Sequence, residues 1–239
     1  MDKAICRVMA APIRLENSDQ SQMLNQALFG ETMDVLEREK HWTKVKMHLD
    51  GYEGWIDTKQ ISLISEEDFN KRNPQILNSN FVIANLKEGR TLLSMGSEVD
   101  FSVDESKRSE KLRDSIVLTA KEFLNIPNLK GGRSFFGIDC SGLVQLVFKV
   151  NGIALPRHSA QQADHGEPLT FVEESQPGDL AFFENSVGEI VHVGIMMDNQ
   201  KIIHASGKVR IDTMDSSGIF NEETNAHTHR LRFVKNVID

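Results

Sequence analysis

The sequence predicts an α+β protein in which a small β-barrel precedes a domain of helices packed on an antiparallel sheet. Residues 1–66 contain short segments typical of strands, separated by turns. From about residue 107 apolar residues recur at helical spacing, and after about residue 179 strand-like segments take over. The length of 239 residues suffices for one large domain or two small ones with ordinary cores.

The composition is that of a globular protein and excludes several classes of function. Hydrophobic residues make up 39% of the chain, charged residues 26%, and the net charge is -8. This acidic excess argues against nucleic acid or a membrane surface as a partner. Cys6 and Cys140 are too few for a disulfide scaffold. No leader-like segment and no apolar run approaching about 18 residues is present, so we expect a cytoplasmic protein if the sequence is complete.

The first 66 residues carry alternating strands and one clear hairpin. Residues 42–47 alternate apolar with polar side chains, as expected of a strand with one wet face. Asp50 and Gly51 form a turn before a strand at residues 52–56, and residues 61–64 are the last predicted strand of this segment. Several short strands in so short a segment predict a small closed barrel.

Residues 67–106 are predicted to be a connector rich in strands. A short polar helix over residues 66–72 should come first, and residues 81–84 and 91–94 are typical of strands. The connector is open to interpretation as a degraded second barrel repeat. The mixed-charge run at residues 104–111 is interpreted as the solvated start of a helix.

The second predicted domain, residues 107–239, places a cysteine at the start of a helix. Residues 143–150 are apolar at helical spacing and follow the glycine-rich segment 131–137. Asp139 is the natural N-cap, so Cys140 falls in the first turn. The free N–H groups and the helix dipole favour an anion there, so we expect a thiol shifted towards thiolate, the form that attacks carbonyl groups. The alternative is a small buried apolar residue, as a free cysteine usually is.

Two histidines on consecutive predicted strands complete a candidate constellation. His192 lies in the apolar segment 190–197 and His204 in the segment 201–205, where a polar ring is costly unless it is hydrogen-bonded. A three-residue hairpin loop makes the two residues diagonal neighbours on one face, roughly 7–8 Å apart between Cα atoms; a two-residue loop would separate them. Either histidine alone could be a core or rim residue. Together with Cys140 they indicate a nucleophile, a base and an orienting group.

A second group of histidines raises the question of a metal site. His227 and His229 stand near Glu222 and Glu223, but without the spacing of zinc-binding helices or cysteine pairs. A solvated loop is the preferred interpretation. The glycine pair at residues 131–132 also lacks the Gly-Lys-Ser end of a phosphate-binding loop. We expect neither a metal nor a cofactor.

The motifs Asp-Cys-Ser-Gly, His-Val-Gly and His-Ala-Ser, in this order, resemble those of the NlpC-type cell-wall cysteine peptidases. They stand at residues 139–142, 192–194 and 204–206, with support from residues 131–134, 155–157 and 176–183. The stretch Gly-Tyr-Glu-Gly-Trp-Ile at residues 51–56 resembles the end of a bacterial SH3-like barrel repeat. The resemblance implies a papain-like domain after an SH3-like barrel, in which Cys140 attacks, His192 is the base and His204 orients it.

The combination of the two domains resembles the γ-D-glutamyl-L-diamino acid endopeptidases, which implies a substrate. Such enzymes cut murein stem peptides between γ-linked D-glutamate and a diamino acid, and those with a barrel bind the amine of a free N-terminal L-alanine. The matching positions are Glu31, Tyr52 and Asp139 for the amine and Ser141 and Ser159 for the D-glutamate. From the residues alone, Tyr52 is equally a barrel-wall aromatic and Glu31 a solvated charge at a strand edge. His158 stands where the family often has Asp, which puts a contact at that position in doubt.

Two other classes of function stay open at this point. One is a non-catalytic module that binds wall peptides, and the other is a thiol acyltransferase that passes the acyl group to an amine. The three intact residues favour a cysteine endopeptidase that acts on murein tripeptides or tetrapeptides during recycling in the cytoplasm. The sequence indicates neither which diamino acid is preferred nor the oligomeric state. A monomer is compatible with the sequence.

Overall fold

A computed structural model confirms the predicted α+β architecture and divides the chain into two compact units. Among the described residues, no helix is both long and apolar enough to cross a membrane. The structure describes residues 2–87, 89–102, 109 and 111–238. The first unit comprises Met1–Lys107 and Leu129–Gly137, and the second comprises Arg108–Asn128 and Ile138–Asp239.

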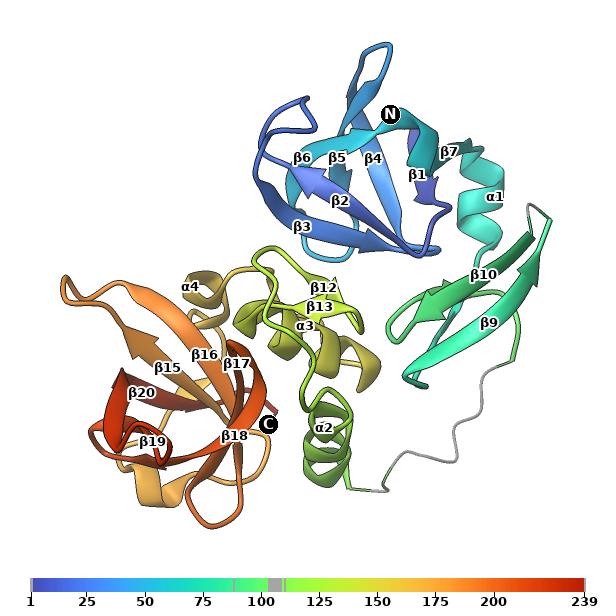
Figure 1. Ribbon diagram of the computed structural model, residues 1–239. Helices are drawn as coiled ribbons and strands as arrows, with labels where there is room; N and C mark the ends of the chain where they lie inside the picture. The colour runs from blue at the N-terminus through green and yellow to red at the C-terminus, as the bar shows by residue number, and fades with distance from the viewer. Residues whose placement is uncertain (1, 88, 103–108, 110, 239) are drawn as a thin grey trace. The chain divides into compact units, whose positions relative to one another are not determined.

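The first unit contains a seven-stranded antiparallel sheet that curls into the predicted SH3-like barrel (Figure 1). Its elements are β1 (Lys3–Cys6), β2 (Ala10–Arg14), β3 (Met23–Leu28), β4 (Thr32–Arg38), β5 (Trp42–Met47), β6 (Glu53–Asp57), η1 (Thr58–Gln60) and β7 (Ile61–Ile64). The predicted hairpin is present, with Val45 of β5 opposite Gly54 of β6. A Cβ on Gly54 would lie 2.5 Å from Ile13 Cγ2, so only glycine lets β2 approach β6 this closely.

The connector also belongs to the first unit and carries a helix and two small sheets. Its elements are α1 (Glu66–Lys71), β8 (Gln75–Ile76), β9 (Phe81–Leu86), β10 (Gly89–Ser94) and β11 (Glu98–Val99). Ser65 caps α1 by accepting a hydrogen bond from the N–H of Asp68. β9 pairs with β10 and β8 with β11, which confirms strands at residues 81–84 and 91–94. The helix start expected at residues 104–111 lies largely outside the described residues.

A buried ion pair anchors the glycine-rich segment in the first unit. Arg133 and Glu31 are 0% and 1% exposed, and Nη2 of Arg133 donates to the Glu31 carboxylate. The same nitrogen donates to the carbonyl oxygen of Gln26 at 3.0 Å, and the Glu31 carboxylate accepts from the N–H of Leu28 at 2.8 Å. This desolvated pair rules out the interpretation of Glu31 as a solvated charge. The short strands β12 (Arg133–Ser134) and β13 (Gly137–Ile138) follow.

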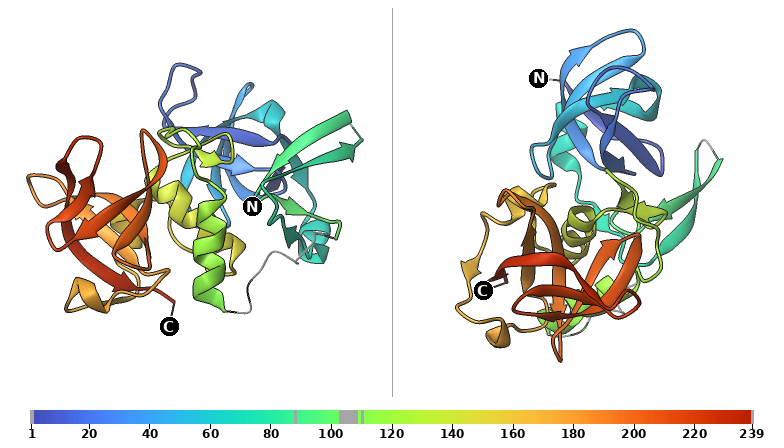
Figure 2. Two further views of the ribbon diagram at one scale, coloured as in Figure 1. Left: turned by 60° about the horizontal axis from the view of Figure 1, so that its bottom comes forward. Right: turned by 60° about the vertical axis from the view of Figure 1, so that its left-hand side comes forward.

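The second unit packs helices against an antiparallel sheet that closes on itself. Its elements are α2 (Leu112–Lys121), α3 (Cys140–Val150), α4 (Ser159–Gln162), β14 (Glu167–Pro168), η2 (Val172–Glu174), β15 (Leu180–Glu184), β16 (Ile190–Met197), β17 (Lys201–Ser206), β18 (Lys208–Asp215), β19 (Gly218–Asn221) and β20 (Ala226–Asn236). The strand order is β14-β20-β15-β16-β17-β18-β19, and β19 also pairs with β20, so β15 to β20 form a six-stranded barrel. α2, α3 and α4 all contact β16 (Figure 2).

Helix α3 starts where the sequence predicts and ends at Val150. The Asp139 carboxylate accepts the N–H of Gly142 at 2.8 Å, which caps the first turn. The helix ends before Asn151, and Gly152 follows with a φ of +84°. All residues from Ser141 to Val150 are buried, so packing on every side holds the N-terminus of this helix in place.

Glu31→Gln should destabilise the first unit. The variant keeps the shape of the side chain but leaves the buried Arg133 guanidinium without a counter-charge, so we expect the free energy of unfolding to fall by about 3–5 kcal/mol. The chain has two tryptophans, Trp42 and Trp55, and both lie in the first unit. Urea unfolding followed by tryptophan fluorescence therefore reports on this unit.

Glu53→Gln is the matched control for that measurement. It breaks the pair between Lys46 and Glu53, whose side chains are 48% and 46% exposed. Exposed pairs contribute at most about 1 kcal/mol. If Glu31→Gln and Glu53→Gln lower the free energy of unfolding by the same amount, the buried pair of Glu31 and Arg133 does not stabilise the first unit as proposed.

Candidate functional site

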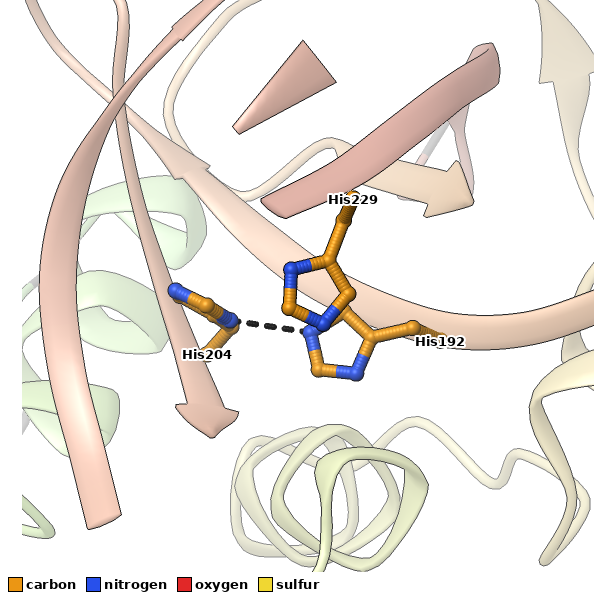
Figure 3. Close-up of side chains that lie close together, drawn as sticks. All are labelled: His192, His204 and His229. Carbon is orange, nitrogen blue, oxygen red and sulfur yellow. Dashed lines mark hydrogen bonds between the residues drawn. The ribbon is translucent and has the colours of Figure 1, made fainter. Parts of the chain in front are cut away.

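The hairpin of β16 and β17 brings His192 and His204 together, as its predicted three-residue loop requires. Met197 pairs with Lys201 and Ile195 with Ile203, and the next residues along the two strands, Gly194 and His204, lie side by side. A Cβ on Gly194 would lie 3.0 Å from the Cβ of His204, so glycine makes room for this ring. His192 Nε2 and His204 Nδ1 are 2.9 Å apart (Figure 3), and the residues are 6% and 1% exposed.

Asp212, on β18, extends this pair into a chain of hydrogen bonds that the sequence analysis missed. Its Oδ2 lies 2.9 Å from His204 Nε2, and its Oδ1 accepts from Arg210 Nη2 at 2.9 Å. Burial raises the pKa of the Asp212 carboxyl, but the hydrogen bonds from His204 and Arg210 outweigh burial and hold the pKa below its usual value. Asp212 is therefore an ionised, buried acceptor.

The ionised carboxylate sets the direction of the whole chain. It can only accept, so the proton of neutral His204 lies on Nε2, and Nδ1 of His204 is an acceptor. His192 must then donate from Nε2, and the lone pair of neutral His192 lies on Nδ1. The arrangement fixes which nitrogen of His192 can act as a base.

Cys140 lies next to His192. It is the first residue of α3, which contacts β16, and the backbone of Val193, the residue after His192, is close enough to the sulfur to lower the pKa of the thiol. Figure 3 shows the second ring nitrogen of His192 pointing away from His204 and towards the helix below it. The structure thus brings Cys140, His192 and His204 together within the second unit.

The Cys140 thiol is neutral in the free protein, so the expectation of a thiolate was wrong. Burial raises the pKa of Cys140 to about 11, and the Asp139 carboxylate adds to the increase, while Arg157 partly opposes it. The pKa of His192 is well below 6.5 because of burial and the two neighbouring imidazoles. A helix dipole contributes only about 0.3–1 kcal/mol, so desolvation of the sulfur outweighs it.

Arg157 organises the predicted site residues beside Cys140. Its Nη1 and Nη2 donate to the two oxygens of Asp139 at 2.8 and 2.7 Å, and Nη1 also donates to Ser141 Oγ at 3.0 Å. Arg157 is 1% exposed, so this bidentate pair is desolvated on the arginine side. Ser159 is buried at the start of α4. From the sequence, Arg157 stood out only as part of the motif at residues 155–157.

The remaining predicted residues lie elsewhere in the two units. Glu31 and Tyr52 belong to the first unit, where Glu31 pairs with Arg133 and half-buried Tyr52 packs against the barrel core. His158, where the family often has Asp, is the exposed N-cap residue of α4. Substrate binding by Glu31, Tyr52, Asp139, Ser141 and Ser159 stays a prediction.

His229 joins the histidine pair, so the interpretation of its segment as a solvated loop was wrong. His227 and His229 lie in β20, where the pairing with β19 shifts register between them: Ile219 pairs with His229 and Phe220 with His227. The His229 ring stacks on that of His192, with centroids 4.1 Å apart, whereas His227 is exposed and bonded to Asp215. Burial and the neighbouring His204 imidazole lower the pKa of His229 to about 4. The ligand nitrogens of His192, His204 and His229 all lie within 4.8 Å of one another, so they could hold a metal ion.

A pocket of about 590 Å³ opens beside His229. It gives small solutes a route to the outer side of this imidazole. Its lining residues are Phe183, Glu184, Asn185, Val191, Ser217, His227, Thr228, His229 and Arg230.

Alkylation of Cys140 by iodoacetamide should accelerate continuously as the pH rises from about 6 to 10, because only the thiolate reacts. With a pKa of about 11, the thiolate fraction keeps growing over this whole range. Mass spectrometry of the labelled peptide measures the rate, and Cys140→Ala shows the contribution of Cys6, which is buried and has a pKa of about 12. A plateau beginning near pH 5, as an ion pair of thiolate and imidazolium would give, contradicts the neutral pair.

Comparisons with known proteins agree with the division into a barrel and a helix-and-sheet unit. Residues 127–228 match the NlpC/P60 family, and residues 13–61 match the bacterial dipeptidyl-peptidase Sh3 domain. The γ-D-glutamyl-L-lysine dipeptidyl-peptidase of Bacillus cereus is 26% identical over 253 residues, which cover 87% of this chain and 76% of that protein. The protein of the same name from Bacillus subtilis is 39% identical over 94 residues, 38% of this chain and 31% of the relative.

Two further comparisons bear on the family and on the fold. The probable endopeptidase NlpC of Escherichia coli is 36% identical over 104 residues, 40% of this chain and 67% of that protein. The crystal structure of an NlpC/P60 family protein from Bacillus cereus superposes with a TM-score of 0.83 at 20% identity and covers 99% of this chain and 100% of its own, which shows a common fold. The chain therefore belongs to the NlpC/P60 family of cell-wall peptidases and carries a bacterial SH3 domain before its peptidase domain.

Proposed function

We propose that the protein is a cysteine endopeptidase that hydrolyses the bond between γ-linked D-glutamate and a diamino acid in murein stem peptides with a free N-terminal L-alanine. The observation that carries the proposal is the hydrogen-bonded chain from His192 through His204 to Asp212, beside the sulfur of Cys140. The Bacillus relatives named γ-D-glutamyl-L-lysine dipeptidyl-peptidase support the substrate class. That this protein acts in the cytoplasm, in the recycling of wall peptides, stays a prediction.

The first chemical step is a proton transfer from Cys140 to His192. Because the free thiol has a pKa of about 11 and His192 is neutral, the sulfur becomes a nucleophile as Nδ1 of His192 takes its proton. The imidazolium that forms donates from Nε2 to His204 Nδ1, and His204 donates to Asp212. The buried carboxylate thus stabilises the positive charge through the intervening ring.

Acyl transfer to sulfur and hydrolysis follow from the same groups. The thiolate attacks the γ-carbonyl carbon of D-glutamate, and the negative charge on the carbonyl oxygen develops near the N-terminus of α3. His192 returns its proton to the leaving amine as the C–N bond breaks, which leaves a thioester on Cys140. His192 then takes a proton from water, the hydroxide attacks the thioester, and the returned proton regenerates the thiol.

The protein should release L-Ala-γ-D-Glu from L-Ala-γ-D-Glu-L-Lys, and Cys140→Ala should release none, because the nucleophile is lost. Liquid chromatography with mass spectrometry measures the product. Cys6→Ala is the matched control, since Cys6 is buried in the barrel core and should leave cleavage intact. Cleavage by the Cys140→Ala variant at the wild-type rate would refute the proposal.

Two arms of the same assay test the finer parts of the proposal. In ¹⁸O-labelled water, one labelled oxygen in the released dipeptide marks water as the acceptor, whereas a conjugate with an added amine marks an acyltransferase. Acetylation of the N-terminal alanine removes the ammonium charge and should lower kcat/KM. An unchanged value would refute recognition of the free amine.

Asp212→Asn should lower kcat at least about tenfold with a smaller effect on KM, because an amide no longer fixes the proton of His204 on Nε2. Asp212→Glu restores an acceptor and should recover part of the rate. Asp215→Asn is the matched control on the same strand, where the exposed carboxylate pairs with His227. An equal effect of Asp212→Asn and Asp215→Asn would contradict the role of the buried carboxylate.

A further inference from the structure

Three imidazoles from three strands of the second unit converge around one point. His192 on β16, His204 on β17 and His229 on β20 present ring nitrogens that all lie within 4.8 Å of one another (Figure 3). Two of these residues are buried and His229 is half-buried. Among the described residues this is the cluster of histidine, cysteine and acidic groups with the geometry of a metal site.

The spacing of the nitrogens suits a tetrahedral ion. Zinc binds imidazole nitrogens at about 2.0–2.1 Å, which places two ligands of a tetrahedron about 3.4 Å apart. His192 Nε2 and His204 Nδ1 are 2.9 Å apart, so these two nitrogens need to separate by only a few tenths of an ångström to bind one ion. His229 supplies the third nitrogen. Three imidazoles favour zinc, copper, nickel or cobalt over magnesium or calcium.

The surroundings of the cluster also fit a metal. His204 holds its Nε2 proton against Asp212, which directs the Nδ1 lone pair into the cluster, as in sites where a carboxylate orients a metal-bound imidazole. The pocket of about 590 Å³ that His229 lines lies beside the third ligand of the cluster, which is the side from which an ion would approach. The Cys140 sulfur is not part of the cluster, so nitrogen atoms alone form the site.

We propose that His192, His204 and His229 bind a single zinc-like divalent cation and that this ion switches the peptidase off. To bind the ion at Nε2, neutral His192 moves its proton from Nε2 to Nδ1. Nδ1 then carries a hydrogen and no longer accepts the proton of Cys140, so the thiolate does not form. Binding of the cation by the three histidines does not depend on whether the protein is a peptidase. Inhibition of peptide cleavage by the cation rests on the proposed function.

Cobalt titration of the Cys140→Ala protein tests the site without the nucleophilic sulfur. We expect visible absorption bands of four-coordinate Co²⁺ that saturate at a single ion per chain and disappear when Zn²⁺ is added. His229→Ala and His229→Asn in the same background should weaken binding at least about tenfold. His227→Ala is the matched control, two residues away on β20 with an exposed side chain, and should bind as tightly as its parent.

The outcomes separate a histidine site from its alternatives. Thermal unfolding first establishes that each variant is folded, and Zn²⁺ should raise the Tm of the parent and of His227→Ala but not of the His229 variants. Equal cobalt affinity of folded His229→Ala and His227→Ala overturns the proposal. So does binding that needs the Cys140 sulfur, recognised by thiolate-to-cobalt charge-transfer bands in the wild type and no binding in Cys140→Ala.

The inhibitory role is measured on the protein with Cys140 intact. Zn²⁺ should stop cleavage of the stem peptide at the concentration at which it binds, and EDTA should restore it. Relative to its own metal-free rate, His229→Ala should need at least about tenfold more Zn²⁺ than His227→Ala. Equal sensitivity overturns the inhibitory role. If the wild type cleaves no peptide, the proposed function fails, while the cobalt titration still decides the metal site.

Discussion

The hydrogen bond between His204 and the buried Asp212 carboxylate is the constraint on which the chemistry of the second unit depends. An ionised carboxylate only accepts, so it fixes the proton of His204 on Nε2 and thereby leaves the lone pair of His192 on Nδ1. With Asp212 uncharged or absent, both rings could exchange tautomers, and His192 would face Cys140 with either a donor or an acceptor. The carboxylate therefore determines, through His204, which nitrogen of His192 is free to accept a proton.

Local patterns predicted the parts of the site that lie close together in sequence. The cap at Asp139 placed Cys140 at a helix start, and the odd hairpin loop placed His192 and His204 on one face. Asp212 could not be found this way, because its strand, β18, was not predicted and its contact with His204 depends on pairing between β17 and β18. The raised pKa of Cys140 is likewise a property of burial, which a helix N-terminus alone does not reveal.

His229 shows the limit of pattern reasoning more sharply. Its strand, β20, reaches the histidine pair because it pairs with β15, the neighbour of β16, and because β19 joins β18 to β20 and closes the sheet. Burial and, to a lesser degree, the stacked His229 ring lower the pKa of His192, which keeps its imidazole neutral. Neutral imidazoles are also the form that binds metals, so the arrangement that suits proton transfer from Cys140 is the one that a divalent cation can occupy.

The two carboxylates predicted to hold the substrate amine are each paired with a buried arginine inside their own unit. Glu31 bonds to Arg133, and Asp139 bonds to both Nη1 and Nη2 of Arg157. Each pair is close to neutral overall, so the attraction of its carboxylate for an ammonium is offset by repulsion from the guanidinium. The pairing therefore weakens the electrostatic contribution that either carboxylate could make to binding an ammonium, without removing it.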